Sequence, residues 1–317
     1  MDALIGHTGF VGSHLAGQHD FGASFNSSTL DQARGRSFRI VVCAAAPGSM
    51  FEANRDPDLD AQRVGALRKR LADLRAERFV LVSTIAVLEQ PASQEDESAT
   101  RFETTLAYGR HRRALEQFCE ATFPDCLVIR LPALFGRGLR KNFVFDLLNP
   151  MPSLLPPARL GELRQRLPAD LGASLDRLYA LDPGTQLARI DRAALESSGL
   201  RDRLDAAVRA ADLGAVQFTC PDSTFQFYDM ADLWQDIGRG LDRGLRILHL
   251  PTEPLRADRV HEAVTGRPMP ATGARLHRED MRTRHPDLWG RTDGYIASAE
   301  ATIVKLRRFA RSEGAAC

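Results

Sequence analysis

Residues 3–15 read ALIGHTGFVGSHL, a short apolar run followed by three glycines with the spacing G-x-x-G-x-x-G. This pattern predicts a strand over 3–5, a tight turn over 6–12 and the start of a helix over 13–18. The first glycine permits a positive φ, the second lets the backbone approach a pyrophosphate, and the third lets helix and strand pack closely. The helix start then presents free N–H groups to the anion. We therefore expect a dinucleotide at this turn, contacted by Gly6, Thr8, Gly9, Phe10, Val11 and Gly12.

Strands and helices alternate through the first half of the chain. Further strands are predicted over 23–25, 39–44, 78–83 and 126–131, with helices over 60–75 and 106–123. Continuous apolar strands of this kind are typical of a parallel sheet that is covered on both faces. We therefore expect an α/β fold with a doubly wound, mostly parallel Rossmann-type sheet.

This alternation predicts a nucleotide-binding domain over residues 1–149. The next residues, 150–215, have a largely helical pattern apart from a hairpin turn at 182–185, and we interpret them as an inserted lobe on the substrate side. Short strands and an amphipathic helix return over 216–250 and complete the nucleotide-binding domain. The tail, 251–317, is expected to be a further segment on the substrate side.

Charge and hydropathy argue against several classes of protein. The 317 residues contain 42 Lys and Arg and 41 Asp and Glu, so the formal net charge is +1. Because there is no excess of cations to neutralise phosphates, we expect no nucleic-acid partner. The apolar runs are far shorter than the ~20 residues that span a bilayer, and no basic signal-like segment precedes the first strand. We therefore expect a cytoplasmic protein without a membrane partner.

The cysteines and histidines predict no metal site. The five cysteines are scattered and form no C-x-x-C pair: Cys43, Cys119, Cys126, Cys220 and Cys317. The eight histidines show no spacing that is typical of metal ligands. We expect reduced thiols, as in cytosolic proteins, rather than a disulfide framework.

Motif-like segments occur at six places, in order: 8–15 (TGFVGSHL), 40–46 (IVVCAAA), 81–87 (LVSTIAV), 108–112 (YGRHR), 130–136 (RLPALFG) and 227–233 (FYDMADL). Together they resemble the extended short-chain dehydrogenase/reductases, the NAD-dependent epimerase/dehydratase family. The resemblance implies an NAD- or NADP-dependent oxidoreductase or epimerase that acts by hydride transfer on a small molecule similar to a nucleotide sugar. It also places Ala44, Ala45 and Ala46 against the dinucleotide, and family habit suggests a homodimer.

The resemblance also implies the catalytic residues. Tyr108 would be the acid/base, with Arg112 where the family has a lysine; residues four apart share one helix face. Arginine keeps the charge that lowers the tyrosine pKa from ~10 and can bond to ribose hydroxyls. Thr84, or Ser83 next to it, would polarise the substrate oxygen, and Thr84 has the better alignment. Ala133 stands at the family's substrate-side asparagine, a second departure.

The end of the second strand bears on the choice of cofactor. It reads Asn26-Ser27-Ser28, without the acid that would hold the adenine ribose hydroxyls. Hydroxyls and the nearby Arg34 and Arg36 would tolerate a 2′-phosphate, so we lean slightly toward NADP over NAD. Alternatively, Asn26 and Ser27 simply form a turn.

The residues expected to hold the substrate are Arg140, Lys141 and Asn142, whose charges and amide could bind a diphosphate. They could equally form a solvated basic loop. Two other functions stay open. Arg112 and Ala133 favour a non-catalytic dinucleotide-binding or sensing protein, and the inserted lobe could build a pocket for the reduction of another carbonyl compound.

Overall fold

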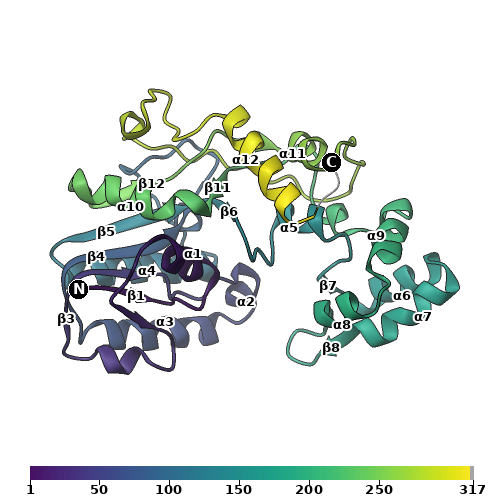
Figure 1. Ribbon diagram of the computed structural model, residues 1–317, viewed down its shortest axis with the longest axis horizontal. Coiled ribbons are helices and arrows are strands. Elements are labelled where there is room, and N and C mark those ends of the chain that lie inside the picture. The colour runs from purple at the N-terminus through teal and green to yellow at the C-terminus, as the bar shows by residue number, and fades with distance from the viewer. Residues whose placement is uncertain (315–317) are drawn as a thin grey trace. The chain divides into compact units, whose positions relative to one another are not determined.

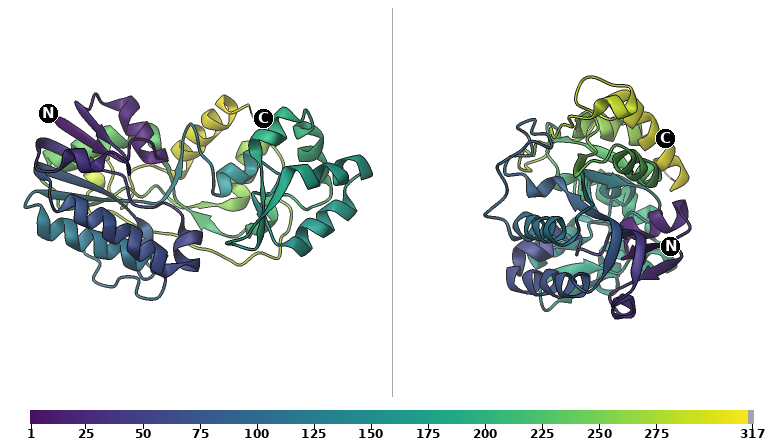
Figure 2. Two further views of the ribbon diagram at one scale, coloured as in Figure 1. Left: turned by 90° about the horizontal axis from the view of Figure 1, so that it is seen from below. Right: turned by 90° about the vertical axis from the view of Figure 1, so that its left-hand side faces the viewer.

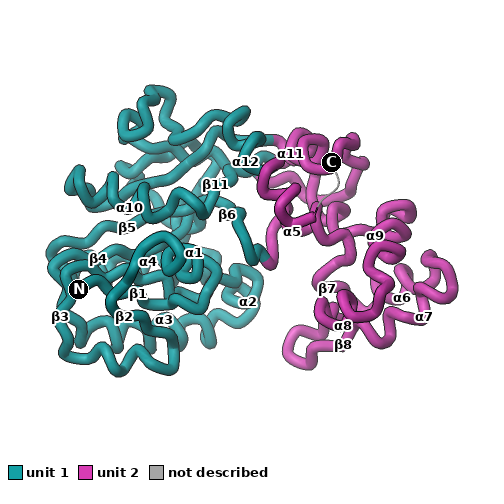
Figure 3. Tube along the Cα trace, in the orientation of Figure 1, with its two compact units in different colours: residues 1–139, 224–255, 278–306 teal, residues 140–223, 256–277, 307–317 magenta. Residues whose placement is uncertain are grey.

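The computed structural model describes residues 1–314, so Cys317 lies outside the described residues. The chain forms two compact units, shown in different colours in Figure 3. Unit 1 comprises 1–139, 224–255 and 278–306, and unit 2 comprises 140–223, 256–277 and the described residues from 307 onward. The unit that contains the expected lobe is larger than 150–215, and the tail is divided between the units. The reason is that helix α5 (Phe143–Leu148) packs on helix α11 (Ala257–Thr265). This contact makes the segments that contain the two helices part of unit 2.

Unit 1 is built on a six-stranded parallel sheet with the order β12-β5-β4-β3-β1-β2 (Figure 1). Its strands are β1 (Asp2–Ile5), β2 (Ala23–Phe25), β3 (Ser37–Cys43), β4 (Arg75–Thr84), β5 (Cys126–Leu131) and β12 (Ile247–His249). Each neighbouring pair runs parallel. The predicted doubly wound sheet is therefore confirmed, with the strands close to their expected positions.

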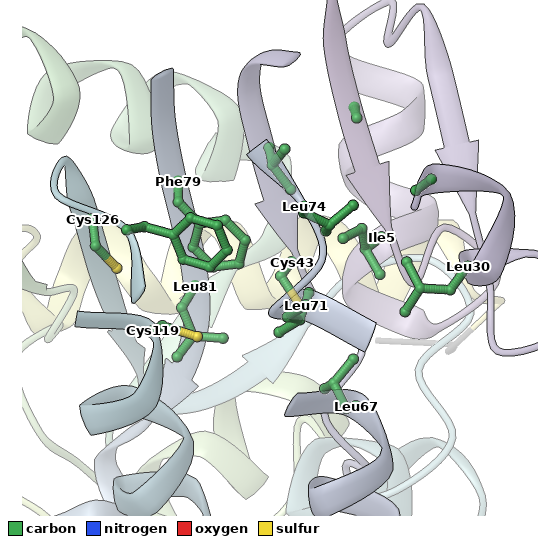
Figure 4. Close-up of a cluster of buried hydrophobic side chains, with 14 of the residues drawn as sticks. Ile5, Leu30, Cys43, Leu67, Leu71, Leu74, Phe79, Leu81, Cys119 and Cys126 are labelled. Atoms are coloured by element: carbon green, nitrogen blue, oxygen red, sulfur yellow. The ribbon is translucent and has the colours of Figure 1, made fainter. Parts of the chain in front are cut away.

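Helices cover both faces of this sheet. On one face, α3 (Pro57–Leu71) and α4 (Ala107–Thr122) lie side by side (Figures 1 and 2). Their apolar residues pack with alternate residues of the strands, and Figure 4 shows part of this core, including Phe79. The ring of Phe79 stacks on that of Phe123, with the centroids 3.9 Å apart. The opposite face packs against α1 (Phe10–Gln18) and α10 (Leu233–Asp242).

The side of the sheet that contains β1 and β2 has one strand fewer than is common in doubly wound sheets. A doubly wound sheet commonly has three strands on each side of the point where strand order reverses. Here only β1 and β2 lie on the first side, and β2 forms the edge. Residues 26–36, which contain only the short 3-10 helix Leu30–Ala33, connect β2 to β3. That segment is too short for another strand with its crossover helix.

Smaller elements complete unit 1. They are α2 (Met50–Arg55), the parallel pair β6 (Ala133–Phe135) and β11 (Phe227–Asp229), the pair β10 (Thr224–Phe225) and β13 (Leu255–Arg256), and the 3-10 helices Ile85–Val87, Met230–Asp232 and Pro286–Trp289. The last helix, α12 (Ala299–Ser312), belongs partly to each unit.

Unit 2 has its own core and a three-stranded antiparallel sheet. Besides α5 and α11 it contains β7 (Leu154–Leu155), α6 (Pro157–Arg166), α7 (Ala169–Leu178), β8 (Tyr179–Asp182), β9 (Leu187–Ile190), α8 (Arg192–Ser197), α9 (Arg201–Ala210) and the 3-10 helix Ala215–Phe218. The predicted hairpin is present as β8 and β9. Its turn is held by Asp182 Oδ1, which accepts hydrogen bonds from the backbone N–H groups of Gly184 (2.9 Å) and Thr185 (3.0 Å).

A buried ionic network ties α4 to the sheet. Glu116 and Arg130 are both 0% exposed and form a two-point ion pair of 2.7 and 3.1 Å. Arg113 also donates to Glu116 (2.8 Å), as does the hydroxyl of Ser83 (2.5 Å). Arg130 further contacts the ring nitrogen of His249 at 3.1 Å. One carboxylate thus links helix α4 to strands β4, β5 and, through Arg130, β12.

The described residues contain no helix that is long and apolar enough to cross a membrane. Within the same residues, no group of three or more His, Cys, Asp or Glu side chains could hold a metal ion. Cys43, Cys119, Cys126 and Cys220 are free thiols. Burial raises the pKa of Cys43 to about 11 and that of Cys126 to about 12, so neither is a thiolate at neutral pH.

The ionic network predicts a large loss of stability in Glu116→Ala. Removing this carboxylate leaves the buried Arg130 without its counter-ion, which should cost about 3–5 kcal/mol in the free energy of unfolding. Glu120→Ala is the matched control, because Glu120 lies on the same helix, 3.6 Å from Arg113 and partly exposed; it should cost less than about 1 kcal/mol. Urea denaturation measures both, and equal losses would contradict a special role of the buried pair.

Candidate functional site

Two of the three glycines in the β1–α1 turn are required by the fold itself. Gly6 has φ +92°, and a Cβ there would lie 2.7 Å from the carbonyl oxygen of Ala44. A Cβ at Gly12 would lie 2.0 Å from the carbonyl oxygen of Gly6. Gly9 differs, because its added Cβ would meet only the oxygen of Gly6, at an ordinary 3.4 Å. The fold therefore leaves space at Gly9 that protein atoms do not use.

The start of α1 has the properties of an anion site. Its N-cap is Gly9, no side chain caps the helix, and its first turn holds no acidic residue. The first-turn N–H groups and the positive end of the helix dipole are therefore available to a negative ligand. The turn lies at the carboxyl end of β1, next to the carboxyl end of β3 and the small residues Ala44–Ala46. This is the point where strand order reverses, at which α/β sheets bind their ligands.

At the end of β2, Asn26 forms a turn. Its side-chain oxygen accepts hydrogen bonds from the N–H of Ser28 (2.9 Å), the hydroxyl of Ser28 (2.7 Å) and the N–H of Thr29 (3.1 Å). Locally, the segment therefore has the turn that was the alternative interpretation of Asn26 and Ser27. The hydroxyl of Ser28 is committed to this turn, whereas Ser27 is exposed.

The arginine beside this turn is one that the sequence did not indicate. Arg70, from α3, donates to the carbonyl oxygen of Ser27 at 2.7 Å and lies 3.2 Å from Asp31. Arg34 instead pairs with Asp73 at 3.1 Å. Arg36 stands just before β3, at the amino edge of the sheet, with its guanidinium over aromatic rings of the core. Arg70 was missed because its proximity to β2 is a tertiary contact across 43 residues.

Tyr108 lies in the first turn of α4, with its side chain largely buried. Its hydroxyl lies near that of Thr84, which follows the buried part of β4 and acts to lower the pKa of Tyr108. Its backbone N–H donates to the side-chain oxygen of Asn54 at 2.8 Å. The residue at the N-cap of α4, Leu106, provides no side-chain hydrogen bond, so Asn54 of α2 satisfies this helix start from outside. No local signal in the sequence pointed to Asn54.

The structure distinguishes between the two hydroxyls at the end of β4. The two hydroxyls meet different residues of helix α4. Ser83 donates to the buried Glu116, at 2.5 Å, whereas Thr84, the last residue of β4, lies near Tyr108 at the start of that helix and accepts from the N–H of Ala86 at 3.2 Å. The hydroxyl of Ser83 is therefore committed to the ionic network, and the one beside Tyr108 belongs to Thr84.

Arg112 shares a helix face with Tyr108, as its spacing predicts, but its donors are bound by other residues. Its guanidinium carbon lies 4.1 Å from the centroid of the Tyr108 ring. One terminal nitrogen donates to Asp60 at 2.5 Å, and the other donates to the carbonyl oxygen of Pro47. His111 contacts the same Asp60 oxygen at 2.8 Å. Asp60, only 4% exposed, is a buried counter-ion that the sequence did not indicate.

These neighbours determine the protonation of Tyr108. Burial raises the pKa of Tyr108 above its usual value of 10, and the negative charge of Asp60 raises it further. The charge of Arg112 and the hydrogen bond from Thr84 act in the opposite direction but do not compensate. Tyr108 is therefore a protonated phenol at neutral pH.

The expected substrate residues, Arg140, Lys141 and Asn142, begin unit 2, whereas Thr84 and Tyr108 belong to unit 1. Asn142 has φ +105°, and its side-chain oxygen caps α5 by accepting from the N–H of Phe145 at 3.1 Å. Its amide therefore has a structural role. Arg140 lines a pocket of about 840 Å³ within unit 2, together with two further arginines, Arg189 and Arg192.

No family model and no curated protein sequence matches this chain. Solved structures do match it along almost its whole length. A dTDP-4-dehydrorhamnose reductase from Bacillus anthracis, in complex with NADP, has a TM-score of 0.61 at 15% identity and covers 98% of this chain and 97% of its own. RMD from Pseudomonas aeruginosa, complexed with NADPH, has a TM-score of 0.60 at 17% identity, with 98% of each chain covered.

A UDP-N-acetylglucosamine 4-epimerase from Methanobrevibacter ruminantium, in complex with UDP-N-acetylmuramic acid, has a TM-score of 0.61 at 10% identity, covering 98% of this chain and 96% of its own. At these identities the likeness shows the fold. The chain therefore shares the Rossmann-type α/β fold of these solved proteins.

Proposed function

We propose that this protein is an NAD(P)-dependent reductase that converts a carbonyl group of a nucleotide-sugar-like substrate to an alcohol, with Tyr108 as the proton donor. The observation that carries the proposal is the pair of hydroxyls of Thr84 and Tyr108, which lie near enough for Thr84 to lower the pKa of Tyr108. The pair stands at the carboxyl end of β4, and the glycine turn follows the carboxyl end of β1. Because the strands are parallel, both groups lie at one edge of the sheet.

The residues at the glycine turn fit a dinucleotide. Gly9 leaves space for close approach, the start of α1 lacks a cap or an acidic side chain, and Ala44–Ala46 are small. Solved structures with this fold are complexed with NADP, NADPH or NAD. A reduced nicotinamide bound here would supply the hydride.

Side chains of the protein would orient the substrate carbonyl oxygen and supply the proton. Thr84 and Tyr108 would both hydrogen-bond to the substrate carbonyl oxygen and so orient the carbonyl carbon. As hydride adds to that carbon, the oxygen becomes an alkoxide and takes the phenolic proton of Tyr108, which leaves an alcohol and a tyrosinate. Arg112, whose guanidinium faces the Tyr108 ring, would stabilise the transient anion, and solvent would return the proton.

The protonated state of Tyr108 suits the reductive direction. Burial raises its pKa, so the phenol carries the proton that a carbonyl oxygen receives when it is reduced. The nucleotide-sugar class of substrate is supported by the names of the structural neighbours, a dehydrorhamnose reductase and UDP-sugar epimerases.

Cofactor binding at the glycine turn predicts that Gly9→Asp abolishes affinity for NAD(P)H while the protein stays folded. The added side chain has room within the fold, but it would place a carboxylate where the pyrophosphate binds. Gly17→Asp introduces the same charge on the same helix at a position with no neighbour within 4 Å, and should bind normally. Calorimetric titration with NADPH measures both. Undiminished affinity in a folded Gly9→Asp protein would refute the assignment of this turn.

Arg70 predicts a preference for NADPH over NADH. A 2′-phosphate at the end of β2 would meet the exposed Ser27 and the guanidinium of Arg70, a charge-assisted contact of ~1–3 kcal/mol. Arg70→Ala should therefore weaken binding of NADPH by about 5- to 150-fold and leave that of NADH unchanged. Arg63→Ala, an exposed arginine of the same helix, is the control. Equal loss for both cofactors, or no preference in the wild type, would contradict this contact.

The proton-donor role predicts that Tyr108→Phe lowers turnover by ~10²–10⁴. The ring and its contact with Arg112 remain, so affinity for NADPH should hardly change. The assay follows NADPH consumption with dTDP-4-dehydrorhamnose and 4-keto UDP-sugars. Tyr179→Phe in unit 2, which removes a hydrogen bond to Pro152, is the control and should retain activity.

Full activity of Tyr108→Phe on a compound that the wild type reduces would exclude Tyr108 as the donor. If the wild type binds NADPH but oxidises it with none of these compounds, the dinucleotide-sensing alternative gains support instead.

A further inference from the structure

Asp60 and Arg112 form a buried pair of opposite charges next to Tyr108. They are 4% and 2% exposed, and the distance between carboxylate oxygen and guanidinium nitrogen is 2.5 Å. Asp60 stands in the first turn of α3 and Arg112 in the second turn of α4, so the pair joins the two helices that cover one face of the sheet. Neither the proposed cofactor contacts nor the neighbouring hydroxyls of Thr84 and Tyr108 require such a carboxylate.

We propose that Asp60 is a positioning residue for the proposed reduction: it holds the guanidinium of Arg112 against the ring of Tyr108, away from the cofactor, and offsets its charge so that Tyr108 remains a proton donor. This inference rests on the proposed function of Tyr108.

The contacts of Arg112 leave it no freedom to bind a cofactor ribose. One terminal nitrogen is bound by Asp60, the other by the carbonyl oxygen of Pro47, and the planar group faces the Tyr108 ring. Its remaining nitrogen, Nε, is enclosed by protein atoms. In the family that the chain resembles, the cation at this position grips the nicotinamide ribose. Here Asp60 instead holds the cation, Arg112, against the ring of Tyr108.

Asp60 opposes part of the effect that the charge of Arg112 has on Tyr108. The groups that act on its hydroxyl are Arg112 on α4, Asp60 on α3 and the Thr84 hydroxyl at the end of β4. His111, 2.8 Å from Asp60, is a further titratable group beside the pair. If Asp60 lost its charge, Arg112 would remain as an uncompensated cation 4.1 Å from the ring, and the pKa of Tyr108 would fall. A larger fraction of Tyr108 would then be ionised before the substrate arrives, and the ionised fraction cannot donate a proton.

Asp60→Asn tests the inference without a substrate. Asparagine has the same shape and still offers an oxygen to Arg112, but it removes the charge. The chain has four tyrosines, and the pKa values of the other three, Tyr179, Tyr228 and Tyr295, are also raised above 10. Titration of tyrosinate absorbance should therefore show one tyrosine in Asp60→Asn that ionises about one pH unit or more below any in the wild type. Circular dichroism at each pH verifies that the protein is folded.

Adding Tyr108→Phe to Asp60→Asn identifies the residue, because the early-titrating tyrosine should disappear. An unchanged tyrosine titration in a folded Asp60→Asn protein would overturn the inference, as would a shift that persists without Tyr108. The double variant Asp60→Asn/Arg112→Gln, which leaves no buried charge uncompensated, serves if the single variant does not fold. It should bind NADPH as the wild type does, and a tenfold or greater loss of affinity would show that Arg112 reaches the cofactor.

These readouts separate the inference from the proposed function. Tyrosine ionisation and NADPH affinity depend only on the arrangement of Asp60, Arg112 and Tyr108. Where the wild type reduces a substrate, Asp60→Asn should in addition shift the alkaline limb of the kcat profile to lower pH, since ionised Tyr108 cannot donate. A failure of Tyr108→Phe to lower turnover would remove the proposed function and leave the tyrosine titration unaffected.

Discussion

The ion pair between Glu116 and Arg130 is the interaction on which the placement of the other groups depends. It lies wholly within the protein and connects helix α4 to the centre of the parallel sheet. The same helix carries Tyr108 and Arg112, so the depth and rotation of α4 determine where both side chains lie. A buried pair of this kind adds little net stability compared with apolar residues, but its geometry is demanding. It therefore defines the position of the helix more than it strengthens the fold.

A second constraint acts at the opposite end of the proposed cofactor site, where backbone segments touch. Gly6 lies so close to the end of β3 that no side chain fits between them, and Gly12 packs equally closely on Gly6. Gly9 alone has space to spare. The pattern of three glycines thus combines two different requirements: close packing of strand and helix at the outer positions, and access for a ligand at the middle one.

The chemistry proposed for Tyr108 follows from burial and from two opposed charges rather than from one activating cation. Arg112 is a departure from the lysine of the resembled family, and Asp60 is the partner that makes a buried guanidinium tolerable at that position. A lysine has a single ammonium and could not bridge both Asp60 and the carbonyl of Pro47 in the same way. In the proposed reduction, Arg112 and Asp60 act together and keep Tyr108 as a phenol that can donate its proton.

The sequence alone determined the sheet, its flanking helices and the glycine turn, because apolar periodicity and glycine spacing can be recognised within one segment of the chain, without its tertiary contacts. It also indicated Tyr108, Arg112 and Thr84, through short motifs within single elements. Only the tertiary structure decided between Ser83 and Thr84, since their difference lies in which residue of α4 each hydroxyl meets. Asn54, Asp60 and Arg70 could not be found from local patterns either. Each is an ordinary helix residue whose role arises from a partner at least 43 residues away, and such contacts exist only once the helices have packed on the sheet.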